Sequence, residues 1–332
     1  MHREGCRVLG MMIAVVSLAA CAVVSGCGAQ VVGGSGATGG GGPTPTPDRT
    51  PPAEGWRWES SLGVEVAVPE DWSVNDTDCN QTDAPTIVRS QGSVLDCLTP
   101  EPPNKQIVEI TRENQDWGKE PPPPAELAVQ EVTIDGERAQ RIEGTTSDGR
   151  AAGWLKFPGL DHVLIRARVH DEELLHRILD SVRVVDVDAN GCATARDGMR
   201  AKPPRASTLL PRDTTSVSIC FFEQDDVIAA SELVSGPEAA ELVDLVNRAK
   251  PGRTPDVPSD LCLRTGEVPL PDVLLIGRTD QDDAIVEVSY SGCTHRGLSN
   301  GRQIAKLGEK VLDAIMLPIE TGYAYSPQGL DD

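Results

Sequence analysis

The chain has 332 residues, which is long enough for two domains of ordinary size with separate hydrophobic cores. It carries 51 acidic side chains against 30 lysines and arginines, for a formal net charge of −21 at pH 7. A chain with this negative charge repels phosphate backbones and anionic lipid headgroups. We therefore expect no nucleic-acid partner and no attachment to a membrane through charge.

The chain begins with the features of an export signal. Arg3 and Arg7 form a short basic head, and an apolar run follows at residues 8–24. The run is at the short end for a bilayer span, which favours a signal peptide over a permanent membrane helix.

Residues 24–27, Val-Ser-Gly-Cys, resemble the lipobox of bacterial lipoproteins. The resemblance implies cleavage of a signal peptide at residues 1–26 and diacylglycerol on Cys27. Residues 18–21, Leu-Ala-Ala-Cys, fit the same pattern, so Cys21 is the alternative. Cys27 is favoured because polar, glycine-rich sequence follows it. We expect the mature chain at the cell membrane, lipid-anchored on the extracytoplasmic face, where acyl-chain burial holds it.

Residues 27–54 have no hydrophobic period. Glycine dominates their first half and a proline-threonine repeat their second half, which predicts a disordered linker that stiffens toward its end. Such a linker lifts the folded part of the chain away from the membrane.

Residues 55–188 are predicted to form a first α/β domain. Order begins near Trp56, and valines at positions 64, 66 and 68 predict a half-buried strand. Further strands are predicted at 107–111, 130–134, 138–143, 151–157, 163–169 and 183–187. Residues 171–182 predict a helix with an apolar stripe of Leu174, Leu175, Ile178 and Val182.

Three segments of this domain resemble the PsbP/Mog1-type α/β domain found in actinobacterial lipoproteins: GVEVAVPEDWSV (63–74), VTIDGERAQRIE (132–143) and ILDSVRVV (178–185). The resemblance implies an antiparallel sheet with helices packed on it. It also implies binding or assembly roles, and it brings no catalytic residues. The chain departs from the pattern at residues 121–125, PPPPA.

Residues 189–332 are predicted to form a second α/β domain, so the whole fold class is α+β with mainly antiparallel sheets. Strands are predicted at 216–222, 226–231, 272–278 and 284–293, and helices at 237–250 and 299–316. The second helix has Ile304, Leu307, Val311 and Ile315 on one stripe. This ββαββα order resembles the C-terminal half of other actinobacterial lipoproteins, a likeness that implies no function.

Six cysteines remain once the signal peptide and the lipidated cysteine are set aside: Cys79, Cys97, Cys192, Cys220, Cys262 and Cys293. An even number in an exported chain predicts disulfides. Cys79–Cys97 is the local pairing in the first domain. Of the three pairings open to the other four cysteines, the predicted hairpin favours Cys262–Cys293, which leaves Cys192–Cys220.

The stretch DVDANGCATARD, residues 186–197, has two interpretations. Alternate oxygen ligands resemble a calcium loop, with Gly191 at the turn and Asp186, Asp188, Asn190 and Asp197 as candidate ligands. A helix precedes the loop in calcium sites of this type, whereas the residues before this loop are predicted to form a strand. We favour a junction between the two domains, in which Gly191 turns the chain and Cys192 ties it to the second domain.

Catalytic patterns are missing from the sequence. It contains no GxSxG, HExxH or Walker motif, and the mature chain has four histidines, His162, His170, His176 and His295. Two of them, His170 and His176, are predicted on one helix but on different faces. We expect no enzyme and no cofactor.

All five tryptophans, Trp56, Trp58, Trp72, Trp117 and Trp154, lie in the first half of the chain, where they favour a core over a ligand groove. Together these features predict a membrane-anchored extracytoplasmic lipoprotein with a non-catalytic binding or envelope-assembly role. Its partner is an envelope protein or a small ligand. The alternatives are a carrier of a small apolar ligand or lipid, with a deep apolar pocket in the first domain, and then an extracellular hydrolase, with a histidine beside a serine and a carboxylate.

Overall fold

The structure is a computed structural model that describes residues 50, 52–76, 82–89, 104–113, 128–196, 199–205, 207–222, 226–257, 272–280 and 283–320. These residues belong to one compact unit, Pro45–Asp332. The predicted signal peptide, Cys21 and Cys27 lie outside the described residues. Within the described ranges, no helix is long and apolar enough to span a membrane. The fold is mixed α+β with mostly antiparallel sheets, as predicted.

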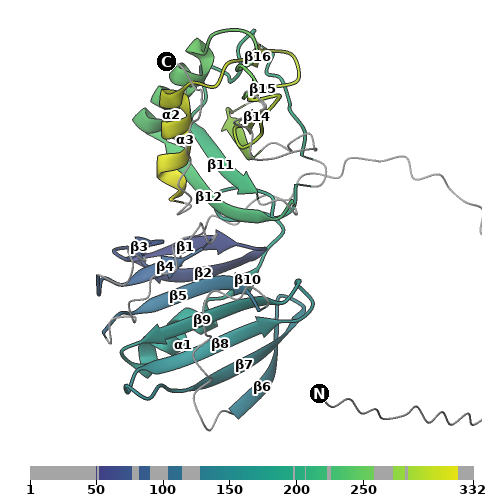
Figure 1. Ribbon diagram of the computed structural model, residues 1–332. Helices are drawn as coiled ribbons and strands as arrows, with labels where there is room; N and C mark the ends of the chain where they lie inside the picture. The colour runs from purple at the N-terminus through teal and green to yellow at the C-terminus, as the bar shows by residue number, and fades with distance from the viewer. Residues whose placement is uncertain are drawn as a thin grey trace, which may run out of the picture. The chain divides into compact units, whose positions relative to one another are not determined.

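The largest sheet lies in the first half of the chain and has the strand order β3-β4-β5-β9-β8-β7-β6 (Figure 1). Only the β3–β4 and β4–β5 pairs are parallel. The predicted strands are confirmed, two of them with their predicted bounds. The seven strands are β3 (Ser73–Val74), β4 (Thr86–Val88), β5 (Ile107–Arg112), β6 (Ala128–Ile134), β7 (Glu137–Thr145), β8 (Ala151–Phe157) and β9 (Val163–Val169).

A smaller sheet places β2 (Val64–Pro69) between β1 (Trp56–Ser61) and β10 (Arg183–Val184). The prediction that β2 is half-buried was wrong, because both of its faces are buried. Glu65, at the centre of β2, is fully buried, and it accepts from Nε of Arg183 at 2.5 Å and from the N–H of Ala189 at 2.6 Å. The predicted strand at 183–187 is shorter than expected, since only its first two residues pair with β2.

The helix α1 (Glu172–Asp180) packs on β2, β8 and β9. It begins where the side chain of Asp171 accepts from the N–H of Leu174 at 2.8 Å, a standard N-cap contact. Its buried stripe consists of Leu175, Ile178 and Leu179, whereas Leu174 is only half-buried. This stripe closes the core of the first half of the chain over the large sheet.

The second half of the chain forms an antiparallel sheet with the order β12-β11-β13-β14-β15-β16. Both faces of β11 are buried: Val217, Ile219 and Phe221 enter the main core, and Cys220 and Phe222 enter a smaller cluster on the other face. The strands are β11 (Ser216–Phe222), β12 (Ile228–Ser235), β13 (Val273–Arg278), β14 (Asp283–Ser289), β15 (Gly297–Ser299) and β16 (Ile304–Ala305).

Helices α2 (Gly236–Arg248) and α3 (Glu309–Ile319) lie side by side against β11 and β12 (Figure 1). The prediction of one helix over 299–316 was wrong at its start. The side chain of buried Asn300 accepts from the N–H groups of Arg302 and Gln303 at 3.0 and 2.8 Å, and so makes a turn. Ile304 follows this turn in β16 and is 42% exposed, so it does not belong to the helical stripe.

The turn between β1 and β2 meets β12 directly. The N–H of Leu62 donates to the carbonyl oxygen of Ile228 at 2.8 Å. Since β12 is the edge strand of the second sheet, this contact places side chains of β1 opposite side chains of β12. The candidate site lies between them.

Candidate functional site

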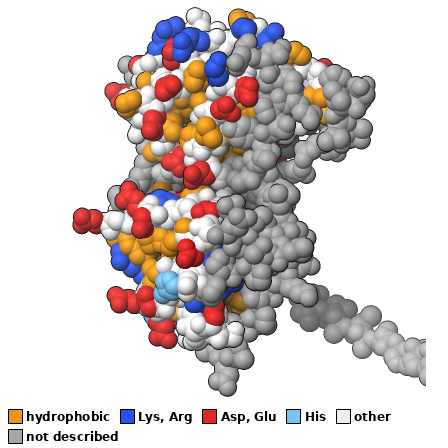
Figure 2. Space-filling view, turned by 60° about the vertical axis from the view of Figure 1, so that its left-hand side comes forward, with side chains coloured by type: hydrophobic (Ala, Val, Ile, Leu, Met, Phe, Trp, Pro, Cys, Tyr) orange, Lys and Arg blue, Asp and Glu red, His pale blue; other side chains and the backbone are white. Residues whose placement is uncertain are grey.

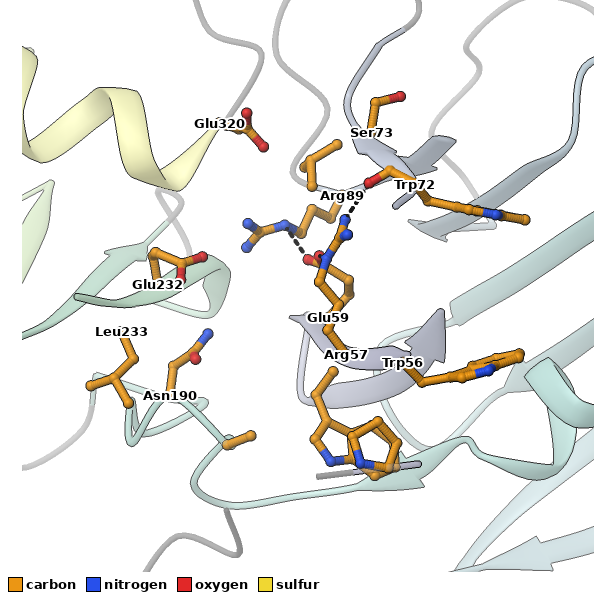
Figure 3. A pocket seen from close by; sticks show the side chains of 14 residues that line it. Trp56, Arg57, Glu59, Trp72, Ser73, Arg89, Asn190, Glu232, Leu233 and Glu320 are labelled. Atoms are coloured by element: carbon orange, nitrogen blue, oxygen red, sulfur yellow. Dashed lines mark hydrogen bonds and ion pairs between the residues drawn. The ribbon is translucent and has the colours of Figure 1, made fainter. Parts of the chain in front are cut away.

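A pocket of about 490 Å³ lies between β1, β12 and the end of α3 (Figure 3). Its volume falls in the usual range for small-molecule sites, ~300–1,000 Å³. The walls combine charged and apolar side chains from distant parts of the sequence. They are formed by Pro52, Trp56, Arg57, Trp58, Glu59, Trp72, Ser73, Val74, Arg89, Ala189, Asn190, Glu232, Leu233 and Glu320.

Arg89, directly after β4, is the central cation of this pocket and is only 2% exposed. One terminal nitrogen donates to the carbonyl oxygen of Ser231 at 3.0 Å, and the other to that of Ile319 at 3.1 Å. Its Nε lies 2.8 Å from Oε2 of Glu59, at an angle outside hydrogen-bond geometry, so that contact is chiefly Coulombic. These contacts join the first half of the chain to both β12 and α3.

Arg57 is the second cation of the wall. Its Nε donates to Oε1 of Glu59 at 2.6 Å, and a terminal nitrogen donates to the carbonyl oxygen of Trp72 at 2.6 Å. The other terminal nitrogen donates to the carbonyl oxygen of Glu70. Glu59 therefore lies between two guanidinium groups, and every terminal nitrogen of both arginines donates to a backbone carbonyl oxygen (Figure 3).

Glu232 and Glu320 bring two more carboxylates to the pocket, and Figure 3 shows both directed toward Arg89. Burial raises the pKa of each carboxyl group. The Arg89 guanidinium opposes the rise, and the negative charge of Glu59 adds to it. Among the described residues, neither carboxylate has an ion-pair partner within 4.0 Å. Glu232 is half-buried and is the less compensated of the two, whereas Glu320 is exposed to solvent.

Asp188 lies beside the pocket and is completely buried. Burial raises the pKa of its carboxyl group, although the Ser231 hydroxyl and the N–H of Cys192 stabilise its ionised form. That N–H donates to Oδ1 of Asp188 at 2.7 Å. Asn190 donates from Nδ2 to the carbonyl and hydroxyl oxygens of Ser231 at 3.1 and 3.0 Å. Both side chains thus connect the turn to β12.

The stretch around Asp188 is a tight hairpin. Val187 pairs with Ala193, and Gly191 turns the chain with a φ of 81°. Asp186, Asp188 and Asn190 lie in this hairpin, whereas Asp197 lies outside the described residues, so the calcium loop stays a prediction. In the part of the chain that the structure describes, no group of three or more His, Cys, Asp or Glu side chains is arranged to hold a metal ion.

The Cys192–Cys220 disulfide is present, as the predicted pairing requires. Its S–S distance is 2.00 Å and its Cα–Cα distance 5.6 Å, and both cysteines are fully buried. It ties the hairpin to β11. Cys293 is also disulfide-bonded, while Cys262, its predicted partner, lies outside the described residues with Cys79 and Cys97.

Trp56, Trp58 and Trp72 line the pocket, and Trp72 also belongs to the hydrophobic core. Trp72 and Trp154 are buried in hydrophobic clusters, as the core interpretation predicts, and Trp117 lies outside the described residues. The ring of Trp56 packs under the Arg177 guanidinium, 3.9 Å from its centroid, and Figure 3 shows that ring directed away from Glu232. Trp58 lines the pocket and lies under Arg183 at 4.0 Å.

The histidines lie away from the pocket. His162 is 3.7 Å from Glu113, His176 is 3.3 Å from Glu143, and Nδ1 of His295 is 3.0 Å from Oγ1 of Thr294. His170 precedes α1, so its predicted place on that helix was wrong.

The charged residues of the pocket were missed by the sequence analysis. A signal for them exists, since Arg57 and Glu59 alternate on one face of β1 and Glu232 interrupts the apolar run of β12. Charged residues inside otherwise apolar strands need a partner: Glu59 pairs with Arg57 and Arg89, and the Arg89 charge also acts on Glu232.

A comparison of the chain with protein-family models, curated proteins and solved structures found no match. The resemblance to the PsbP/Mog1-type domain therefore stays a prediction.

Proposed function

We propose that this chain is a lipid-anchored extracytoplasmic protein that binds a small polar ligand in the pocket between β1 and β12. The observation that carries the proposal is the pocket itself, which has the volume of a ligand site and five charged side chains in its walls. Arg57 and Arg89 are held by hydrogen bonds to the protein, so the walls of the pocket are preorganised for ligand binding.

A binding role fits these walls better than a catalytic one. Among the described residues that line the pocket there is no histidine and no cysteine, and both arginines are bonded to protein oxygens. The charged walls also favour a polar ligand over the apolar ligand of the carrier alternative. An apolar molecule would leave Glu232 and Glu320 buried without a partner, which is unfavourable.

A substitution that fills the cavity tests whether the pocket is the ligand site. Leu233 lines the pocket and is half-buried, so Leu233→Trp places an indole in the cavity. Val129→Trp is the matched control, because Val129 lies on edge strand β6 and is 56% exposed. Detergent-solubilised full-length protein is screened against small polar metabolites by thermal shift and native mass spectrometry. We expect ligands that stabilise the wild type and Val129→Trp but not Leu233→Trp. A ligand that binds all three proteins equally would place the site elsewhere.

The anchor is tested separately with Cys27→Ala and Cys21→Ala in cells fed labelled palmitate. We expect Cys27→Ala to lose the label and to leave the membrane fraction, while Cys21→Ala keeps both properties. Loss in Cys21→Ala alone would assign the lipid to Cys21. Full labelling of the double variant would show that the lipid anchor is wrong.

A further inference from the structure

The charges around the pocket do not balance. Glu59, Glu232 and Glu320 line it together with Arg57 and Arg89, and Asp188 interacts with Arg89 from behind the wall. Four carboxylates thus share two guanidinium groups, which leaves a formal charge of −2 if all of them are ionised. Glu59 lies against both arginines, so the deficit falls on the other three carboxylates.

Two of those three carboxylates are open to a ligand. Asp188 is fully buried and accepts from the Cys192 backbone, whereas Glu232 and Glu320 line the cavity (Figure 3). They belong to different elements, β12 and the end of α3, and the Arg89 guanidinium is directed between them. Burial raises the pKa of both carboxyl groups, which indicates that Arg89 compensates them incompletely.

The carboxylates of the pocket disfavour an anion. The terminal nitrogens of Arg89 are used by the carbonyl oxygens of Ser231 and Ile319, and those of Arg57 by carbonyl oxygens of residues 69–72. Each terminal nitrogen of Arg89 has a second N–H, but a bound anion would also meet the carboxylates of Glu232 and Glu320, which have no ion-pair partner among the described residues.

A bare metal ion fits less well than an organic cation. The described residues contain no cluster of three metal-ligating side chains, and a cavity of about 490 Å³ is far larger than one ion. The lining also includes apolar residues, among them Pro52, Trp58 and Leu233.

We propose that the pocket binds an organic cation, an ammonium or guanidinium group on a short carbon chain, with Glu232 and Glu320 pairing with its charge. The carbon chain packs on apolar lining residues such as Leu233. This inference rests on the proposed function, namely that the pocket is a ligand site. The whole protein favours such a ligand, because a net charge of −21 attracts cations from solution. On the coloured part of the face in Figure 2, acidic side chains lie among basic and apolar ones.

Calorimetry on the detergent-solubilised full-length protein tests the charge of the ligand. The probes are 1,5-diaminopentane and agmatine, with 1,5-pentanediol and glutarate as neutral and anionic compounds of similar length. We expect binding of the two cations only. Glu232→Gln and Glu320→Gln should each weaken cation binding about tenfold or more, since each removes a charged hydrogen-bond partner. Glu241→Gln is the control, because Glu241 is exposed on α2 and outside the pocket, and it should bind like the wild type.

Two further arms separate the outcomes. A blocked peptide with one lysine asks whether the cation comes from a partner protein: binding of the peptide but not of the diamine assigns it to a protein side chain. Equal binding of pentanediol and diaminopentane, or unchanged cation binding by the Glu232→Gln/Glu320→Gln double variant, overturns the inference. If no cation binds but a neutral ligand binds the wild type and not Leu233→Trp, the proposed function holds and the cation inference is wrong. If no ligand of any charge binds, both proposals fail.

Discussion

Arg89 donates to the carbonyl oxygen of Ile319 at 3.1 Å, and so joins residues that are 230 positions apart in the sequence. Ile319 is the last residue of α3, whose final carbonyl groups have no partner inside the helix. The last turn of α3 contains no basic residue of its own, so Arg89 supplies the positive charge that stabilises a helix C-terminus. One side chain therefore caps a helix, pairs with Glu59 and forms a pocket wall.

Replacing Arg89 should destabilise the protein strongly. Arg89→Met leaves Glu59 with one guanidinium partner, removes the Arg89 hydrogen bond to the Ile319 carbonyl oxygen, and leaves the Ser231 carbonyl oxygen with Asn190 as its side-chain donor. We expect a loss of ~3–5 kcal/mol in the free energy of unfolding, as for other broken buried ion pairs. Urea denaturation measures it. Arg248→Met is the control, because Arg248 pairs with Asp244 on the exposed surface of α2 and should cost at most ~0.5 kcal/mol. Equal losses in the two variants would contradict the central role of Arg89.

The buried disulfide should stabilise the fold by restricting the unfolded chain. Cys192 and Cys220 are separated by 28 residues, and a loop of that size corresponds to ~3–4 kcal/mol in the chain-entropy model. We expect Cys192→Ala/Cys220→Ala to lose about that amount in urea denaturation. The double variant is preferable to a reducing agent, because Cys293 is also disulfide-bonded and would be reduced too. A loss below ~1 kcal/mol would show that the hairpin is held mainly by the contacts of Asp188 and Asn190.

Two glycines with positive φ separate backbone strain from steric overlap. At Gly297, where φ is 139°, an added Cβ would lie 2.7 Å from the backbone oxygen of Ala305. At Gly252, where φ is 107°, an added Cβ would meet no atom within 4 Å. We expect Gly252→Ala to cost ~1–2 kcal/mol from strain alone and Gly297→Ala to cost ~1–3 kcal/mol more. Thermal unfolding of both variants measures the difference, and equal costs would show that β15 moves freely away from β16.

The strands were predicted most accurately where their apolar pattern was continuous. β8, β9 and β11 have the predicted bounds, because apolar residues fill both faces and polar turns bound them. The predicted start of the last helix at residue 299 was wrong, because Ile304 matches the helical period although it does not lie in the helix. Local turn chemistry decided that segment: the side chain of Asn300 accepts two backbone N–H groups and breaks the helix that the period suggests.

The pocket was beyond the reach of sequence reasoning for a different reason. Arg89 follows a strand of three residues and stands before a polar segment, so its sequence neighbourhood suggests an exposed side chain. It is buried because Ser231 and Ile319 offer carbonyl oxygens that no local pattern connects to it. A lone sequence shows which residues are apolar, but it does not show which buried charges meet across the fold.

The carboxyl group of Glu232 should make the stability of the protein depend on pH. Burial raises its pKa above the ordinary 4.5, so the folded state binds this proton more tightly than the unfolded state does. Stability from this group is therefore present at low pH and is lost as pH rises through the raised pKa. Since Glu232→Gln cannot ionise, we expect its stability relative to the wild type to be higher at about pH 8 than at about pH 4.5.

Urea denaturation of the wild type, Glu232→Gln and Glu241→Gln at several pH values between those limits measures the effect. Comparing each variant with the wild type cancels the other titrating groups, including Asp148, whose pKa is lowered to about 2 by the Thr146 hydroxyl and Arg150. The Glu241→Gln curve should run parallel to the wild type, because Glu241 is exposed on α2. A parallel Glu232→Gln curve would mean that Arg89 fully compensates Glu232. That result would also remove the charge deficit that favours a cationic ligand.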